Sequence, residues 1–295
     1  MLTLLSRSPL NSGVSRAFSR RLVSTVPLAF DKWDPRKVDP KQPPIIILHG
    51  LFGSKNNNRT VARALARDLH TPVFCPDLRN HGDSPHAAPH NYDALSADVI
   101  DFIKSQKFSL PPTVIGHSMG AKTAMAVALQ APELVSNLVP VENGPLSVQL
   151  SPEFGKYIEG MFAVERAQAH QQSEMYEIMN KYCSELPVQQ FLLSNFKRHH
   201  DTGVYHCRMD LNVLAKSLGN VVDFDKYTTG DLRFTKPTLL LRGTRSNFVP
   251  DECLPLMGQL FPRFELRECD SGHWLISEKP REFLAFVLEF LDLKD

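Results

Sequence analysis

The chain contains an uninterrupted apolar run, Ile45-Ile46-Ile47-Leu48, which predicts a strand buried on both faces. After this run, segments with the apolar periodicity of a helix alternate with short segments typical of a strand. Helices are predicted over about residues 60–69, 92–105 and 121–130, and short strands over residues 73–75 and 113–115. Strands and helices that alternate at such short spacing are typical of a mostly parallel sheet with helices on both faces.

The alternation is interrupted in the second half of the chain, where residues 147–226 show helical patterns only. Three strands and a closing helix flank this segment, at residues 138–141, 238–241, 264–267 and 281–291. Ligands of open α/β sheets bind at the carboxyl edge of the sheet, so an insertion there is a candidate lid. We therefore predict one core in two parts, residues 43–146 and 227–295, with a helical cap between them.

The N-terminus has a composition of its own. Residues 1–30 contain eight Ser or Thr and no Asp or Glu, together with Arg7, Arg16, Arg20 and Arg21. This is typical of a mitochondrial transit peptide, whereas a secretory signal would need a continuous apolar core. We predict a transit peptide of about residues 1–25, a linker at residues 26–42 and a location in the mitochondrial matrix; a disordered basic tail is the alternative.

Composition narrows the classes of partner. The formal net charge of +1 provides no basic excess for nucleic acid, and no apolar run approaches the roughly 20 residues of a membrane span. The five cysteines form no C-x-x-C pair, so neither a disulfide framework nor a zinc ribbon is indicated. A small-molecule substrate without metal or cofactor is expected. The irregular group His199, His200, His206 and Cys207 is more typical of a solvated cap surface than of a zinc site.

Gly116-His117-Ser118-Met119-Gly120 matches the pattern G-x-S-x-G directly after a predicted strand and directly before a predicted helix. In the α/β-hydrolase fold this turn lifts a nucleophilic serine clear of the sheet, which an ordinary glycine-rich turn would not need to do. The motif therefore predicts that fold, with Ser118 as the nucleophile. Because the fold orders its triad as serine, acid and histidine, His273, in the loop after residues 264–267, is the predicted general base.

The acid has two candidate places. The turn after residues 238–241 has Asn247 where a carboxylate is expected, and an amide cannot stabilise an imidazolium. The preceding strand runs straight into Glu142, which we predict to orient His273, with Asp251 as the second choice and Asp210 as the third. A carboxylate at a strand end can also be merely ion-paired, and that alternative stays open here.

Two backbone amides are predicted to stabilise an oxyanion. One follows the nucleophile, at Met119, and the other belongs to the loop His49-Gly50-Leu51-Phe52-Gly53, where Leu51 is preferred and Phe52 is the alternative. The polar run from Arg79 to Ser84 follows the next strand. Its side chains are expected to hold that loop together rather than to contact substrate.

Four motifs occur in order: His49-Gly50-Leu51-Phe52-Gly53-Ser54, Asp77-Leu78-Arg79-Asn80-His81-Gly82-Asp83-Ser84-Pro85, Gly116-His117-Ser118-Met119-Gly120-Ala121-Lys122 and Gly272-His273-Trp274. With these, residues 43–291 resemble the mitochondrial α/β-hydrolases that include abhydrolase domain-containing protein 11, its fungal relatives and the yeast ethanol acetyltransferases. The resemblance implies Ser118 and His273 as catalytic residues, a mitochondrial location, and an acid at Glu142, where similar members usually have Asp.

These residues support an acyl-enzyme mechanism on an ester or thioester. Hydrolysis is the leading hypothesis, because water needs no dedicated site. An alcohol O-acetyltransferase that makes acetate esters from acetyl-CoA and ethanol is the alternative, since both reactions use the same triad. A third hypothesis is a protein that binds a mitochondrial enzyme complex and has incidental esterase activity.

Overall fold

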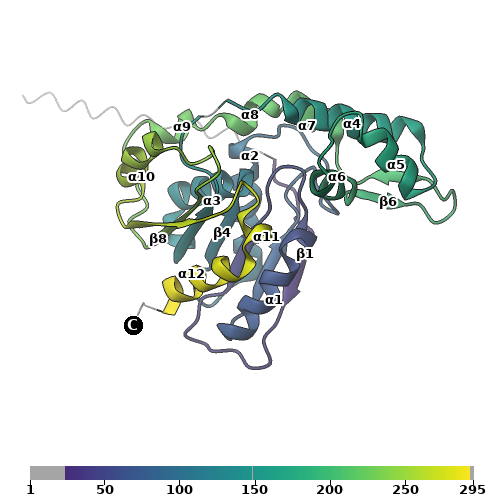
Figure 1. The fold of residues 1–295 in the computed structure, drawn as a ribbon. Coiled ribbons are helices and arrows are strands. Elements are labelled where there is room, and N and C mark those ends of the chain that lie inside the picture. The colour runs from purple at the N-terminus through teal and green to yellow at the C-terminus, as the bar shows by residue number, and fades with distance from the viewer. Residues whose placement is uncertain (1–23, 148, 293–295) are drawn as a thin grey trace, which may run out of the picture.

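A computed structural model describes residues 24–292 apart from residue 148 (Figure 1). The predicted transit peptide falls almost wholly on residues 1–23, outside the described residues. The core is a seven-stranded sheet in the order β1-β3-β2-β4-β5-β8-β9. Its strands are β1 (Phe30–Trp33), β2 (Ile45–Leu48), β3 (Val73–Pro76), β4 (Thr113–His117), β5 (Asn137–Val141), β8 (Thr238–Gly243) and β9 (Phe264–Cys269). Only the β1–β3 pair of this sheet is antiparallel, which confirms the predicted mostly parallel sheet.

Helices cover both faces of the sheet, and β2 shows why. Ile45 and Ile47 pack on one face with α1 (Arg59–Asp68), α11 (Leu275–Glu278) and α12 (Pro280–Asp292). Ile46 and Leu48 pack on the other face with α2 (Tyr92–Gln106), α3 (Met119–Gln130) and α10 (Leu254–Leu260). Because side chains alternate along a strand, an entirely apolar strand serves both layers. Short 3-10 helices complete the core at η1 (Lys55–Asn58), η2 (Pro132–Leu134) and η3 (Asp251–Cys253).

The inserted segment lies along the top of Figure 1. Its helices are α4 (Glu153–Ala167), α5 (Gln172–Met179), α6 (Leu186–Leu193), α7 (Leu211–Lys216), α8 (Leu218–Val222) and α9 (Asp225–Thr228). The expectation of helices only is wrong, because β6 (Phe196–Arg198) and β7 (Tyr205–Cys207) form an antiparallel hairpin. Strands of three residues are too short to leave an alternating pattern in the sequence. Within residues 24–147 and 149–292, no helix is both long and apolar enough to cross a membrane.

The segment predicted as a linker at residues 26–42 is partly built into the core, because it contains β1 and the buried side chains of Val26 and Leu28. The Val26 amide donates to Asp98 Oδ1 at 2.9 Å. Arg79 holds the same carboxylate with two nitrogen–oxygen contacts of 2.6 and 2.7 Å, and it also donates to the carbonyl of Ser24 at 2.9 Å. Arg79, in the polar loop after β3, therefore fastens the N-terminal segment to α2.

Replacing Arg79 with methionine is expected to lower the free energy of unfolding by about 3–5 kcal/mol, because it leaves a buried carboxylate without its partner. Both side chains of the Arg79–Asp98 pair are fully buried. Burial raises the pKa of Asp98 even with the guanidinium beside it. Urea unfolding would measure the loss. In the control Arg267→Met, whose pair with Glu289 is exposed, a change of about 0.5 kcal/mol or less is expected. Equal losses would contradict this account.

Candidate active site

Ser118 lies on the turn between β4 and α3 in a conformation that is unusual for a residue with a side chain, with φ 54° and ψ −115°. The flanking glycines make the turn possible. A Cβ on Gly116 would lie 2.1 Å from the carbonyl oxygen of Gly120, and a Cβ on Gly120 would lie 2.4 Å from that of Leu48. The Ser118 amide donates to the Val141 carbonyl at 2.9 Å, which ties the turn to β5. The turn thus holds Ser118 at the carboxyl edge of the sheet.

Ser118, His273 and Glu142 form an ordered line of contacts. His273 Nε2 lies 3.0 Å from Ser118 Oγ, and Nδ1 of the same ring lies 3.3 Å from Glu142 Oε2. Glu142 follows β5 directly and is fully buried. Its Oε1 accepts a hydrogen bond from the amide of Gly243 at the end of β8. Both carboxylate oxygens are therefore held, one by backbone and one by the imidazole.

The other candidate acids lie elsewhere. Asp251 is 80% exposed and pairs with Arg242 at 2.5 Å. Asp210 caps α7 by accepting the Val213 amide at 3.0 Å. Asn247 is exposed in the loop after β8. The structure therefore brings Glu142 to His273 and leaves these three side chains engaged with other groups or exposed.

Two aromatic residues that we did not predict support the His273 ring and its loop. Phe248 stacks on the imidazole, with ring centroids 3.7 Å apart and planes 21° apart. His117, the second residue of the serine motif, donates from Nε2 to the His273 carbonyl at 2.7 Å. Burial lowers the pKa of His117 to about 3, so it stays a neutral donor. The only sequence signals were an aromatic residue directly after Asn247, the position where the acid was expected, and a histidine in a variable position of the serine motif.

The two predicted oxyanion amides are free to donate. Neither the Leu51 nor the Met119 amide has an acceptor within the described part of the chain. Met119 is the first residue of α3, where backbone N–H groups lack helical partners. The alternative donor, Phe52, is engaged, because its amide donates to His81 Nε2 at 3.2 Å. His49 Nε2 accepts the Leu78 amide at 2.9 Å, which anchors the loop that carries Leu51.

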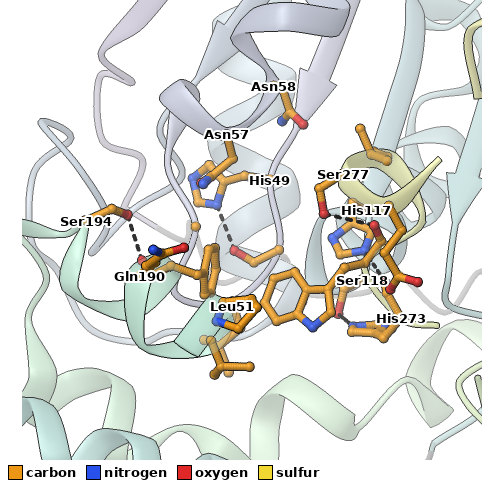
Figure 2. A pocket seen from close by; sticks show the side chains of 18 of the residues that line it. His49, Leu51, Asn57, Asn58, His117, Ser118, Gln190, Ser194, His273 and Ser277 are labelled. Carbon is orange, nitrogen blue, oxygen red and sulfur yellow. Dashed lines mark hydrogen bonds between the residues drawn. The ribbon is translucent and has the colours of Figure 1, made fainter. Parts of the chain in front are cut away.

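Two cavities meet at Ser118. The larger is a groove of about 660 Å³ that runs between the core and the cap helix α6, and Figure 2 shows Ser118 and His273 pointing toward one another at one side of it. The smaller cavity has about 20 Å³. His273 lines the groove and not the small cavity, whereas Leu51 and Ser118 line both. The two cavities thus provide two compartments of unequal size that both reach the serine.

Four buried histidines surround these loops, and burial is the main cause that lowers the pKa of each: His49, His81, His90 and His117. For His90 and His117 the pKa falls to about 3. A neutral imidazole donates from one nitrogen and accepts at the other, as His49 and His81 do. The neutral histidines therefore help to hold the loops around the site in place through hydrogen bonds.

Acid is expected to destabilise the fold through His90 and His117. Their ordinary pKa is 6.5, so between about pH 6 and pH 4 these two groups together bind roughly two protons more in the unfolded chain than in the folded chain. His49 and His81, whose pKa is also lowered, act in the same direction. The free energy of unfolding should fall as the pH is lowered through this window, by about 1.4 kcal/mol per pH unit for each histidine. Denaturant unfolding at several pH values would measure the slope. His90→Gln should reduce it, whereas His200→Gln, at an exposed position, should not; equal slopes would contradict the account.

The histidines of the cap do not form a metal site with the residues around them. His206 Nδ1 lies 3.0 Å from Glu165 Oε1, and the His200 side chain is fully exposed. In residues 24–147 and 149–292, no group of three or more His, Cys, Asp or Glu side chains is arranged to hold a metal ion.

The chain is similar to several known proteins. A family model described as alpha/beta hydrolase fold matches residues 43–168. A probable alcohol acetyltransferase of Saccharomyces cerevisiae is 37% identical over 85% of this chain and 78% of its own length. The sn-1-specific diacylglycerol lipase ABHD11 of Xenopus laevis is 35% identical over 90% of this chain and 84% of its own length. A solved structure of a marine microorganism esterase is 32% identical, covers 90% of this chain and all of its own, and superposes with a TM-score of 0.81.

The resemblance predicted from the four motifs is confirmed, since these relatives match nearly the whole described chain. The family and the named activities of the relatives support an enzyme with hydrolase activity. The chain therefore belongs to the α/β-hydrolase family, in the branch that includes ABHD11 and the yeast alcohol acetyltransferases.

Proposed function

We propose that this protein is a serine hydrolase of carboxylic esters or thioesters that works through an acyl-enzyme on Ser118. His273 is the general base and Glu142 the acid that orients it. The observation that carries the proposal is the line of contacts at 3.0 Å from Ser118 Oγ to His273 Nε2 and 3.3 Å from His273 Nδ1 to Glu142 Oε2. A nucleophile, a base and an orienting group in hydrogen-bond reach are the parts that acyl transfer requires.

The reaction begins when Ser118 Oγ attacks the substrate carbonyl while its proton passes to His273 Nε2. The amides of Leu51 and Met119 stabilise the oxyanion, and the buried Glu142 carboxylate stabilises the imidazolium. His273 then gives the proton to the leaving oxygen or sulfur, and the bond from the carbonyl carbon to that atom breaks. Water, deprotonated by the same imidazole, attacks the acyl-enzyme and releases the acid.

The proton transfer to the leaving atom indicates which part of the substrate each cavity accepts. The leaving atom must reach His273 Nε2, and His273 lines the groove of about 660 Å³ but not the small cavity. The leaving group therefore occupies the groove, and the acyl group enters the small cavity of about 20 Å³. That space holds roughly one or two non-hydrogen atoms beyond the carbonyl. We propose substrates with a short acyl group on a larger leaving group.

Alcohol acetyltransfer is the second candidate, because an acyl cavity of about 20 Å³ also suits acetyl and relatives carry that name. The groove favours hydrolysis of a neutral ester. Within the described residues, its lining includes Glu185 and Glu278 but no Lys or Arg. Glu278 is partly compensated by Arg245 at 3.4 Å, and Glu185 is exposed. Such a lining is poorly matched to the phosphate groups of coenzyme A.

We further propose where in the cell the protein works and whether it acts by binding other proteins. A mitochondrial matrix location is supported by the four arginines and the absence of Asp and Glu in residues 1–30. A role confined to binding a mitochondrial enzyme complex is disfavoured, because such a role would require neither Ser118 nor His273.

A fluorophosphonate probe tests the proposal directly. The wild type should be labelled, and mass spectrometry should place the adduct on Ser118, because only an activated serine reacts with such probes. His273→Ala should react far more slowly, while Ser277→Ala, which alters another serine of the groove, should be labelled like the wild type. An unlabelled wild type, or an adduct on another residue, would remove the nucleophile assignment.

A product assay separates hydrolysis from transfer. Aryl acetates and acetyl-CoA are each incubated with the protein, with and without ethanol, and acetate and ethyl acetate are measured. Acetate release from the neutral ester, unchanged by ethanol, is the expected result. Ethyl acetate as the main product would reverse the preference for hydrolysis.

A further inference from the structure

The loop that carries Leu51 is a tight turn with a strained residue in it. The Gly53 amide donates to the Gly50 carbonyl at 3.0 Å, so Leu51 and Phe52 are the two central residues of the turn. Phe52 has a φ of 61°. A positive φ at the third position of a turn favours glycine or asparagine, and a phenylalanine keeps it only where its surroundings impose it.

Side chains hold the peptide groups on both sides of Phe52. The Phe52 amide donates to His81 Nε2 at 3.2 Å. This nitrogen is the acceptor of the imidazole, because His81 Nδ1 donates to the Arg79 carbonyl at 2.9 Å. On the other side, the Phe52 carbonyl accepts a hydrogen bond from Asn195 Nδ2 at 2.8 Å. Because peptide groups are planar, fixing both of them fixes the φ and ψ of the residue between them.

Asn195 belongs to the cap, where it lies between the end of α6 and the start of β6. It is 1% exposed. Its Nδ2 also lies 3.2 Å from the Leu192 carbonyl and 3.5 Å from the Phe191 carbonyl, both in α6. Helix α6 supplies one wall of the groove, including Val188 and Phe191. A single buried side chain therefore links the helix that lines the groove to the turn that carries Leu51.

We propose that Asn195 is a positioning residue for the oxyanion hole, so that the cap takes part in catalysis as well as in binding. This rests on the proposed function, in which the Leu51 amide stabilises the oxyanion. That amide shares a peptide group with the Gly50 carbonyl, which accepts from the Gly53 amide. The Gly53 amide in turn shares a peptide group with the Phe52 carbonyl, which Asn195 holds. Without Asn195, this last peptide group can rotate, and the direction of the Leu51 amide is no longer fixed.

Asn195→Leu tests the proposal with benzyl acetate as the substrate. Leucine has nearly the shape of asparagine but no donor. We expect kcat and kcat/KM to fall together by about 10- to 100-fold, with KM changed less than about threefold, because the oxyanion exists only in the transition state. Loss of a whole oxyanion donor costs roughly 10²- to 10³-fold. The smaller loss is expected because His49 Nδ1 still donates to the Gly50 carbonyl at 2.8 Å.

Gln189→Met is the matched control, because it removes another buried amide from the same helix. Gln189 is 4% exposed, and its Nε2 donates to the Cys183 carbonyl at 2.6 Å and to Asn180 Oδ1 at 3.1 Å, both within the cap. Its loss disturbs the packing of α6 but leaves the hydrogen bond from Asn195 to Phe52. Its kcat should stay within about threefold of the wild-type value.

A pair of ketones separates positioning of the oxyanion amide from general loosening of the groove. In a methyl ketone with a difluoromethylene group and a benzyl group on the groove side, Ser118 Oγ bonds to the carbonyl carbon, the serine proton passes to His273, and the carbonyl oxygen becomes an oxyanion. The matching ketone without fluorine binds with its planar carbonyl. Asn195→Leu should raise the inhibition constant of the fluorinated ketone by about 10- to 100-fold and that of the other by less than about threefold. Equal changes in both constants would overturn the proposal.

The remaining outcomes separate the role of Asn195 from the proposed function. If Asn195→Leu does not fold, Asn195→Ala takes its place, and its kcat should fall at least about fivefold. A folded variant with kcat within about threefold of the wild type, or an equal loss in Gln189→Met, would overturn the role of Asn195 alone when the wild type is labelled on Ser118. A wild type that is neither labelled nor active on benzyl acetate would overturn the proposed function, and the positioning role with it.

Discussion

Replacing Ser118 with alanine is expected to reduce kcat for ester hydrolysis by a factor on the order of 10⁵ to 10⁶ and to abolish fluorophosphonate labelling. Without Oγ no acyl-enzyme can form, and the imidazole, whose Nε2 lies 3.0 Å from that oxygen, has no proton to accept from it. The amides of Leu51 and Met119 remain, so a residual acceleration on the order of 10³ over water is expected. Steady-state hydrolysis of an aryl acetate at high enzyme concentration would measure the loss.

The fold should survive this substitution. Alanine keeps the Cβ of Ser118, and the positive φ of 54° is imposed by the surrounding turn rather than by the hydroxyl. The melting temperature of the variant should therefore stay close to that of the wild type. Ser277→Ala provides the activity control. A Ser118→Ala protein that is folded and retains more than about a tenth of wild-type kcat would show that another group attacks the substrate.

Much of the core could be predicted because its pattern is local. Ile45 to Leu48 is apolar at every position, and such a short run rich in β-branched residues is typical of a strand packed on both faces. β1 could not be recognised in the same way. It is an edge strand of four residues, Phe30 to Trp33, in which every second residue is half-buried and the others are exposed. Its partner β3 lies about forty residues away in the sequence. Short strands depend on their partners, which the sequence does not reveal.

The site also has features that could be predicted from the sequence and features that could not. The order of Ser118, Glu142 and His273 along the chain follows from the fold, so their approach could be anticipated. The sequence could not show that Asp251 is engaged elsewhere. Arg242, near the end of β8, pairs with Asp251 at 2.5 Å, and this contact depends on the folded structure. The small cavity depends on how the cap residues Val221 and Val222 pack over the serine. Neither contact leaves a periodic signal.

Replacing Glu142 with glutamine is expected to reduce kcat by a factor on the order of 10⁴. The glutamine oxygen can still accept the Gly243 amide, so the amide nitrogen would take the place of Oε2, which lies 3.3 Å from His273 Nδ1. Two donors cannot share that contact, and the imidazole would move its proton to Nε2. His273 could then no longer accept the proton of Ser118.

Replacing Glu142 with aspartate distinguishes the effect of the carboxylate charge from the effect of side-chain length. Glu142→Asp keeps the carboxylate but removes one methylene, so it cannot hold both Gly243 and His273 in their present positions, and a loss of about 10²-fold in kcat is expected from the misplaced base. Asp251→Asn should leave kcat nearly unchanged, because its carboxylate is 80% exposed and contacts Arg242. Comparing kcat of the three variants at one pH, with folding checked by circular dichroism, ranks the candidates. A larger loss in Asp251→Asn than in Glu142→Gln would mean that the loop after β8 rearranges during turnover to supply the acid, since only such a movement could bring Asp251 to the imidazole.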